Sequence, residues 1–416
     1  MMERRTFLRG LGALGCSAAA HPLMTTVTLA QSASGAAPLG DHRLVVIILR
    51  GAMDGLDVVR PVDPILAKLR PSMAEAPPAL PLADRFGLHP SLGGLLPLWA
   101  KGELAFAHAV STPYRNKRSH FDGQDLLEAG TGMDVPLGAH REGWLNRMLQ
   151  AVPGLTAETA FAVGRDALPL LAGRQPTMSW APDVKLALTA QTQLLLEHVW
   201  HDDELFRESG TEAMQLAAET AGAGDEGQDQ DMSMMAAAET AAPKEPKANG
   251  TAGIDGLIDF AVSRLAGDTR IAAFSQGGWD THRNQARALQ GPLSQLERSV
   301  LRLSEGLGPQ VWGKTILLAM TEFGRTVAEN GTGGTDHGTG GVMLMAGGAL
   351  KGAGVLGRWP GLEEADLFDR RDLMPTSDVR SWAAWAMHHL YGLDRQVLEA
   401  AVFPGLDMGD DPGFVA

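Results

Sequence analysis

The chain has 416 residues, which is enough for one large α/β domain, and its formal net charge at pH 7 is −14. Apolar residues make up 44% of the chain and charged residues 20%, as in globular proteins, and no apolar run reaches the roughly 18 residues of a membrane span. Because nucleic-acid binding needs a basic surface, this acidic composition argues against nucleic acid as a partner.

The first residues have the order of an export signal. Arg4 and Arg5 precede a weakly apolar run that ends in small residues, and the paired arginines indicate the twin-arginine route. We therefore expect residues 1–33 to be a twin-arginine signal peptide, the export machinery to be a partner, and the mature protein to be periplasmic or secreted. The single cysteine, Cys16, lies inside this signal, so we expect no thiol ligand in the mature chain.

Apolar runs alternate with amphipathic segments along most of the chain. In chain order we predict a strand at 42–51, a helix at 91–102 that begins at Ser91, a strand at 103–110, helices at 119–130 and 141–152, and a strand at 159–164. Next come a helix at 254–267, a strand at 269–276, a helix at 283–307 interrupted near Pro292, strands at 314–324 and 341–348, and a helix at 376–393. This alternation predicts a three-layer α/β/α sandwich with a mostly parallel sheet, formed by a single domain at 41–416.

One segment of that domain has a different composition. Residues 211–250 are rich in Ala, Gly, Asp and Pro, and they contain no aromatic residue. Such a segment cannot bury enough apolar surface to order itself, so we predict a low-complexity, disordered insertion there.

Several acidic and basic side chains lie directly beside the predicted strand ends. They are Asp54, Asp280, His282, Glu322, Arg325, Asp336 and His337. Ligands of open α/β sheets bind beyond the carboxyl ends of the strands, and Asp and His together suit a divalent metal. The loop GTGGTDHGTGG at 331–341 also fits a surface turn, but its coincidence with the other groups favours a site. We predict a metal site with the ligands Asp54, Asp280, His282, Asp336 and His337.

Five motifs carry a resemblance to a known family. In chain order they are GAMDGLDVVRP, RSHFDGQDLLEAG, GGWDTH, TEFGRT and TDHGTGG. Together they resemble the bacterial twin-arginine-exported family called domain of unknown function 1501, which is related to the alkaline phosphatase and sulfatase superfamily. The resemblance covers nearly all of the chain after the signal, apart from the insertion. It implies an alkaline-phosphatase-like fold and descent from metal-dependent hydrolases.

The superfamily's first metal-binding aspartate, which follows the first strand, matches Asp54 by this resemblance. Its Asp-His-Gly metal motif matches Asp336, His337 and Gly338. One metal ion would then be held by Asp54 together with the Asp-His pair of the glycine-rich loop.

The motif for a second metal ion is matched less closely. The superfamily has Asp-x-x-x-His there, whereas a single residue separates Asp280 from His282. No later histidine stands in a suitable loop, so Glu322 or His120 is the candidate that would complete the second set of ligands.

The superfamily's nucleophile is a hydroxyl or modified cysteine at a helix start, and two serines are candidates here. Ser119 has the required order, but the sequence from Ser119 to Asp122 also fits the cap of a helix. Ser111, in STPYR, resembles the Ser-x-Pro-x-Arg core of sulfatases. Both remain open at this stage. Arg325 either grips an anionic group in fork geometry or pairs with a neighbouring glutamate.

These observations lead to one function and one alternative. We expect an exported metal-dependent hydrolase of phosphate or sulfate esters, acting on a small anionic ester with Zn²⁺, Mn²⁺, Mg²⁺ or Ca²⁺ as cofactor. Its catalytic residues would be Ser119, His120, Glu322 and Arg325. The alternative is a non-catalytic envelope protein derived from that fold, which binds an anion or a partner protein.

Overall fold

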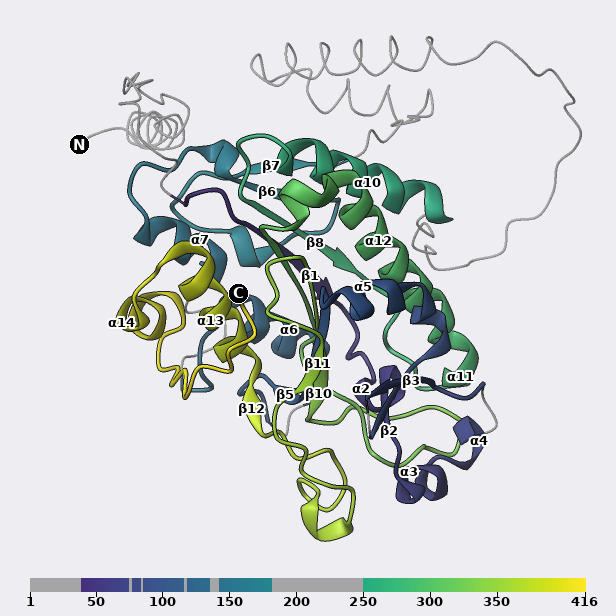
Figure 1. The fold of residues 1–416 in the computed structure, drawn as a ribbon. Coiled ribbons are helices and arrows are strands. Elements are labelled where there is room, and N and C mark those ends of the chain that lie inside the picture. Colours follow the sequence, from purple (N-terminus) through teal and green to yellow (C-terminus); the bar gives the residue numbers. More distant parts are fainter. Residues whose placement is uncertain (1–38, 75–76, 84, 116–117, 135–141, 182–249) are drawn as a thin grey trace, which may run out of the picture. The chain divides into compact units, whose positions relative to one another are not determined.

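The structure is a computed structural model that describes residues 39–74, 77–83, 85–115, 118–134, 142–181 and 250–416. Within it, Asp41–Ala416 forms one compact unit (Figure 1). The predicted signal peptide at 1–33 lies outside the described residues, as does the predicted insertion up to residue 249. Among the helices of the described ranges, none is both long and apolar enough to cross a membrane.

The strands of the described residues form two sheets. The large sheet has the order β11-β5-β10-β9-β1-β8-β6-β7, with β12 also paired to β5. Its strands are β1 (Arg43–Leu49), β5 (Leu104–Ser111), β6 (Ala160–Val163), β7 (Met178–Trp180), β8 (Ile271–Gln276), β9 (Thr315–Met320), β10 (Gly341–Ala346), β11 (Gly354–Leu356) and β12 (Ser377–Asp378). The small sheet has the order β2-β4-β3, with β2 (Val59–Pro61), β3 (Leu80–Ala83) and β4 (Phe86–Leu88).

The large sheet is mostly parallel, as predicted. Strand β1 pairs in parallel with β8 on one side and with β9 on the other, while β10 runs antiparallel to both β9 and β5. All seven residues of β1 are buried, which is typical of a central strand covered on both faces.

Helices cover both faces of this sheet and complete the predicted three layers (Figure 1). The helices of the described residues are α2 (Gly55–Val58), α3 (Pro64–Leu69), α4 (Pro71–Ala74), α5 (Leu96–Lys101), α6 (His120–Ala129), α7 (Trp144–Ala151), α10 (Gly250–Leu265), α11 (Gln285–Ala288), α12 (Gln290–Trp312), α13 (Val379–Tyr391) and α14 (Arg395–Val397). Short 3₁₀ turns lie at Pro90–Leu95, Ala157–Thr159, Pro169–Leu171 and Glu364–Asp366, and a π-turn at Leu398–Val402. On one face α10, α12 and α5 share a core with the sheet, through residues such as Ile258, Val300, Leu98 and Val45. On the other face lie α6, α7 and α13.

Two predicted helices differ in detail from the observed ones. The segment 91–102 is a 3₁₀ turn capped by His89 and followed by α5, so the helical region begins before Ser91. The segment 283–307 divides at Leu289 and bends again at Gly308, where φ is 64°. Pro292 causes no break, because it lies in the first turn of α12, where no intrahelical N–H is required.

The arrangement of β8, β1 and β9 places the loops that carry the site. These three neighbouring strands are parallel, so their carboxyl ends meet at one edge of the sheet. The chain turns sharply there after β1, with Gly51 at φ 120° and Ala52 at φ 60°. A Cβ atom on Gly51 would lie 2.7 Å from the backbone N of Asp280, so only glycine allows the two loops to approach this closely.

A buried ion pair fastens this edge. Asp54 caps α2 by accepting hydrogen bonds from two backbone amides, and both of its carboxylate oxygens also bind the guanidinium of Arg70 at 2.8 and 3.2 Å. Arg70 further donates to the carbonyl oxygens of Thr326 and Val327, in the segment after β9. Both side chains are at most 3% exposed, so water cannot solvate either charge if its partner is removed.

Removing the cation of this pair tests its contribution to stability. We expect Arg70→Met to lower the free energy of unfolding by about 3 kcal/mol, because Asp54 would keep its charge without its ionic partner. Urea denaturation followed by circular dichroism measures the change. The control is Arg302→Met, which breaks an ion pair with Asp259 at the surface and should have a much smaller effect. Equal losses in the two variants would contradict this account.

Candidate functional site

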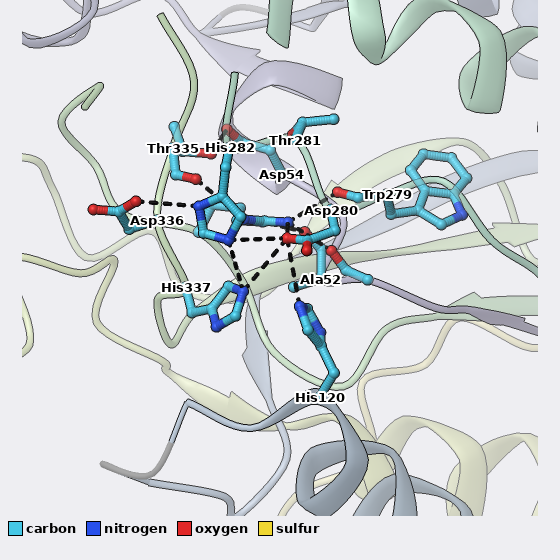
Figure 2. Close-up of polar contacts among 12 residues, drawn as sticks. Ala52, Asp54, His120, Trp279, Asp280, Thr281, His282, Thr335, Asp336 and His337 are labelled. Carbon is cyan, nitrogen blue, oxygen red and sulfur yellow. Dashed lines mark hydrogen bonds and ion pairs between the residues drawn. The ribbon is translucent and has the colours of Figure 1, made fainter. Parts of the chain in front are cut away.

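Three histidines face one carboxylate oxygen at the carboxyl edge of the sheet (Figure 2). Oδ1 of Asp280 lies 3.1 Å from Nε2 of His282. The same oxygen lies 3.4 Å from Nε2 of His120 and 3.4 Å from Nε2 of His337. The Nε2 atoms of His282 and His337 are 3.0 Å apart. We refer to these four residues as the His/Asp cluster.

Separate segments of the chain supply the members of the cluster. Asp280 and His282 lie in the loop after β8, and His337 lies in the glycine-rich loop between β9 and β10. His120 is the first residue of α6, whose start is defined by Ser119: the serine hydroxyl accepts a hydrogen bond from the Asp122 amide at 3.3 Å. Strand order and one helix cap thus bring together residues that are far apart in the sequence.

A buried carboxylate orients His120. Oε1 of Glu322 lies 2.7 Å from Nδ1 of His120, which directs Nε2 toward Asp280. Glu322 is itself fixed by hydrogen bonds from the Gly51 amide at 2.9 Å and from Gln124 at 3.2 Å, and its side chain is fully buried. A histidine held at one nitrogen by a carboxylate, with the other nitrogen free, is the usual arrangement of a metal ligand.

The other two histidines are held in the same way. Nδ1 of His337 lies 2.9 Å from the carbonyl oxygen of Arg118, and Nδ1 of His282 lies 3.2 Å from Oδ1 of Asp336. Asp336 also accepts from the side-chain amide of Asn330 at 3.1 Å. In each case Nε2 is the nitrogen that faces the cluster. Asp336, predicted as a ligand, therefore lies behind His282 and orients it.

Arg325 supports the cluster from the protein interior and is only 1% exposed. One of its Nη atoms lies 2.5 Å from Oδ1 of Asp280. It also donates to carbonyl oxygens of three loops, those of Ala52 (2.8 Å), Gly51 (2.7 Å), Trp279 (3.1 Å) and Thr335 (3.1 Å), and one Nη atom lies 3.5 Å from Nε2 of His282. With its donors bound in this way, Arg325 fixes Asp280 and the surrounding loops, and this geometry does not present it as a fork for a substrate anion.

Charges in the cluster set the protonation of its members. Burial lowers the pKa of the His120 imidazole, but the hydrogen bond and the charge of Glu322 outweigh burial and hold that pKa above its ordinary value. For His337 burial dominates, and its pKa lies below the ordinary value. Burial raises the pKa of the Asp280 carboxyl, whereas the hydrogen bond and charge of Arg325 bring it below the ordinary value. At pH 7 Asp280 is therefore ionised and His337 neutral, the forms that bind metal, whereas the raised pKa of His120 favours its protonated form, from which a metal ion would displace the proton.

The ligand atoms have the spacing of a metal site. Atoms of His120, Asp280 and His337 all lie within 4.8 Å of one another. A tetrahedral ion with ligands at about 2.0–2.1 Å separates those ligands by about 3.3 Å, which is close to the 3.4 Å from Oδ1 of Asp280 to Nε2 of His120 and to Nε2 of His337. Among the side chains of the described residues, Nε2 of His120 is one of two buried polar atoms without a hydrogen bond. A metal ion would satisfy it, so the residues present fit such an ion.

Close backbone contacts explain the glycines of the loop at 331–341. A Cβ atom on Gly338 would lie 2.3 Å from the backbone carbon of Arg325, and one on Gly334 would lie 2.3 Å from that of His282. The loop also pairs with the segment after β9, where the Gly338 amide donates to the Gly324 carbonyl at 2.8 Å. The loop is therefore packed tightly against the site, which a simple surface turn does not require.

Three other predicted site residues have contacts outside the cluster. Asp54 binds Arg70, α2 and Gln285 in the buried layer below the cluster, so its carboxylate is already satisfied. The Ser119 hydroxyl caps α6. The Ser111 hydroxyl donates to the Thr112 carbonyl and accepts from the Arg115 guanidinium.

Sequence reasoning missed several residues that support the cluster. Asn330 binds Asp336, Gln124 binds Glu322, and the Arg118 carbonyl binds His337. Amide side chains and main-chain carbonyls occur throughout any sequence, so no pattern distinguished these. His120, by contrast, could be predicted from the sequence. It directly follows the serine that caps α6, which places its imidazole on the first turn of that helix.

Comparisons with known proteins place the chain in a family without assigning it an activity. The lipoteichoic acid synthase LtaP from Listeria monocytogenes is 7% identical with a TM-score of 0.37, and the match covers 90% of this chain and 76% of that one. A TAB5 alkaline phosphatase variant with Mg bound is 11% identical with a TM-score of 0.31 (73% and 90% covered), and BT1596, a 2-O GAG sulfatase, is 10% identical with a TM-score of 0.30 (75% and 65% covered). TM-scores this low carry no argument about activity.

A search of curated protein sequences found no match. The family model described as "Protein of unknown function (DUF1501)" matches residues 41–402, which include all four members of the His/Asp cluster. The chain therefore belongs to the DUF1501 family.

Proposed function

We propose that this protein is a metal-dependent hydrolase of phosphate or sulfate esters. The observation that supports the proposal most directly is the convergence of three histidine Nε2 atoms on Oδ1 of Asp280. Each histidine is oriented from behind by a carboxylate or a carbonyl, which prepares the free nitrogens for a metal ion.

The ligand types favour zinc over magnesium or calcium. Imidazole nitrogens with one carboxylate oxygen suit Zn²⁺, whereas Mg²⁺ and Ca²⁺ prefer sites made of oxygen atoms. We assign His120, Asp280 and His337 as ligands and His282 as a fourth ligand or a contact to substrate. Arg325 shares Oδ1 of Asp280, so it fixes the direction of that carboxylate and reduces its negative charge.

Bound at this cluster, a divalent ion would polarise an ester oxygen and lower the pKa of water. The residues of the chain hold and orient the reacting groups around it. Because the hydroxyls of Ser119 and Ser111 have structural partners in the described contacts, we propose water rather than a serine as the nucleophile. Glu322 keeps His120 in position and is a positioning residue.

The expected cellular location follows from a part of the chain outside the described residues. The paired arginines Arg4 and Arg5 before a weakly apolar run support a twin-arginine signal peptide at 1–33. We propose export by that pathway, which carries folded proteins and therefore allows the metal to be bound before export.

Removing one histidine tests the metal site. We expect His337→Ala to reduce bound zinc from about one ion per chain to nearly none after dialysis. A tetrahedral zinc ion has only about four ligands, so the loss of one protein ligand greatly weakens its binding. Elemental analysis by mass spectrometry measures the ion, and circular dichroism checks that the variant is folded. The matched control is His388→Ala on α13, where the imidazole binds the Leu393 carbonyl, and it should keep its zinc. Full occupancy in His337→Ala would refute the site.

Glu322 gives a separate test of how the cluster is oriented. Glu322→Gln keeps the size of the side chain but removes the charge that holds His120, so we expect zinc affinity to fall about 10- to 100-fold. Competition with a fluorescent chelator measures the affinity. The control is Glu329→Gln, whose carboxylate binds Ser72 outside the cluster, and its affinity should match that of the unaltered protein. If both variants bind zinc equally well, Glu322 has no positioning role.

Turnover tests the proposed activity itself. We expect the zinc-loaded protein to hydrolyse at least one of a panel of aryl phosphate monoesters, phosphate diesters and aryl sulfates, and a chelator to abolish that turnover. Ser119→Ala should retain most of it. If Ser119→Ala is inactive while holding zinc, serine rather than water is the nucleophile. Zinc binding with no turnover on the whole panel would favour the non-catalytic alternative.

A further inference from the structure

A large apolar side chain stands in solvent next to the His/Asp cluster. Phe121 is 85% exposed, the highest value among the large apolar residues of the described ranges, and it directly follows His120. Single exposed apolar residues are common on protein surfaces, so exposure alone implies nothing. Phe121 differs from the other exposed apolar residues because it directly follows a member of the cluster.

The geometry of α6 defines where Phe121 points. His120 and Gln124, one turn apart, both bind Glu322 and therefore share the inner face of the helix. Phe121 is rotated by about 100° from His120 and lies on the same side as the exposed Asp125. Since consecutive Cα atoms are about 3.8 Å apart, the backbone of Phe121 adjoins a member of the cluster, and its ring projects into solvent from there.

Arg118 provides a positive charge at the same edge. Its backbone has a φ of 53°, and its carbonyl oxygen lies 2.9 Å from Nδ1 of His337, so the residue lies directly against the cluster. Its side chain is exposed, and its charge acts on Asp372, which binds Thr339 of the glycine-rich loop. The guanidinium of Arg325 is not exposed in this way. Its N–H groups bind backbone carbonyls and Asp280 in the interior.

We propose that Arg118 and Phe121 are specificity-determining residues that select an anionic ester of an aromatic alcohol. This proposal rests on the proposed hydrolase. Arg118 attracts and binds the phosphate or sulfate group as it approaches the cluster, because an exposed guanidinium is free to donate two parallel hydrogen bonds. Phe121 packs against the aromatic group of the substrate and is covered by it, which favours aryl over small alkyl esters.

Two compounds that cannot be hydrolysed separate these roles. Phenylphosphonate carries the anionic group and a ring, and methylphosphonate carries the anionic group alone. Calorimetric titration of the zinc-loaded full chain should show that phenylphosphonate binds about tenfold more tightly. Phe121→Ala should remove this preference without changing methylphosphonate binding, and Phe121→Leu should restore part of it.

Arg118→Gln should weaken the binding of both compounds about tenfold and leave their ratio unchanged, since the two share the anionic group. Arg302→Gln on α12 is the matched control and should alter neither. Zinc content and thermal unfolding are measured for every variant, because the Arg118 carbonyl holds His337. The zinc content and the thermal unfolding temperature of each variant should equal those of the unaltered protein.

The outcomes distinguish this inference from the proposed function. If the unaltered protein binds the two phosphonates equally, or if Phe121→Ala keeps the preference, Phe121 does not contact substrate. Unchanged binding in Arg118→Gln removes Arg118 from the recognition site. In each case turnover of esters by the unaltered protein would leave the hydrolase proposal standing. If the zinc-loaded protein binds neither phosphonate and hydrolyses no ester, the proposed function fails, and the specificity proposal fails with it.

Discussion

The buried guanidinium of Arg325 joins the loops on which the site depends. It binds carbonyl oxygens of Ala52 after β1, Trp279 after β8 and Thr335 in the glycine-rich loop, and it pairs with Asp280. Burying a cation costs several kcal/mol unless its donors are satisfied. Only an arrangement in which all these loops converge satisfies them. The charge thus selects the loop conformation that also brings the histidines together.

Carboxylates have three different roles around this guanidinium. Asp280 belongs to the cluster, while Glu322 and Asp336 lie behind His120 and His282 and orient them. Asp54, one layer deeper, binds Arg70 and holds the turn after β1 to the segment after β9. Acidic residues at the strand ends thus differ in role according to their hydrogen-bond partners and not their burial, since Glu322 and Asp54 are both buried whereas Asp336 is exposed.

The sequence predicted the framework of the site well. The central strands, the mostly parallel sheet and the edge where polar residues gather follow from apolar runs and parallel strand order, which are local or nearly local properties. The sequence predicted Asp54 as a ligand but could not show that it binds Arg70, because a motif position does not reveal a partner 16 residues away. The interruption predicted near Pro292 occurs at Leu289, just before α12, and Pro292 itself is accommodated in the first turn of that helix.

Residue type and spacing established the fold class, the edge of the sheet that carries the site and a set of side chains able to bind metal. They did so because hydrophobic periodicity and strand order act over short stretches of chain. Which of these side chains faces the cluster, and which orients or anchors another residue, depends on the packed fold. Whether Nε2 of His120 faces Asp280, or whether Arg325 meets carbonyls or solvent, follows from contacts between segments 160 to 273 residues apart. Such contacts are made only when burial removes water as the competing partner.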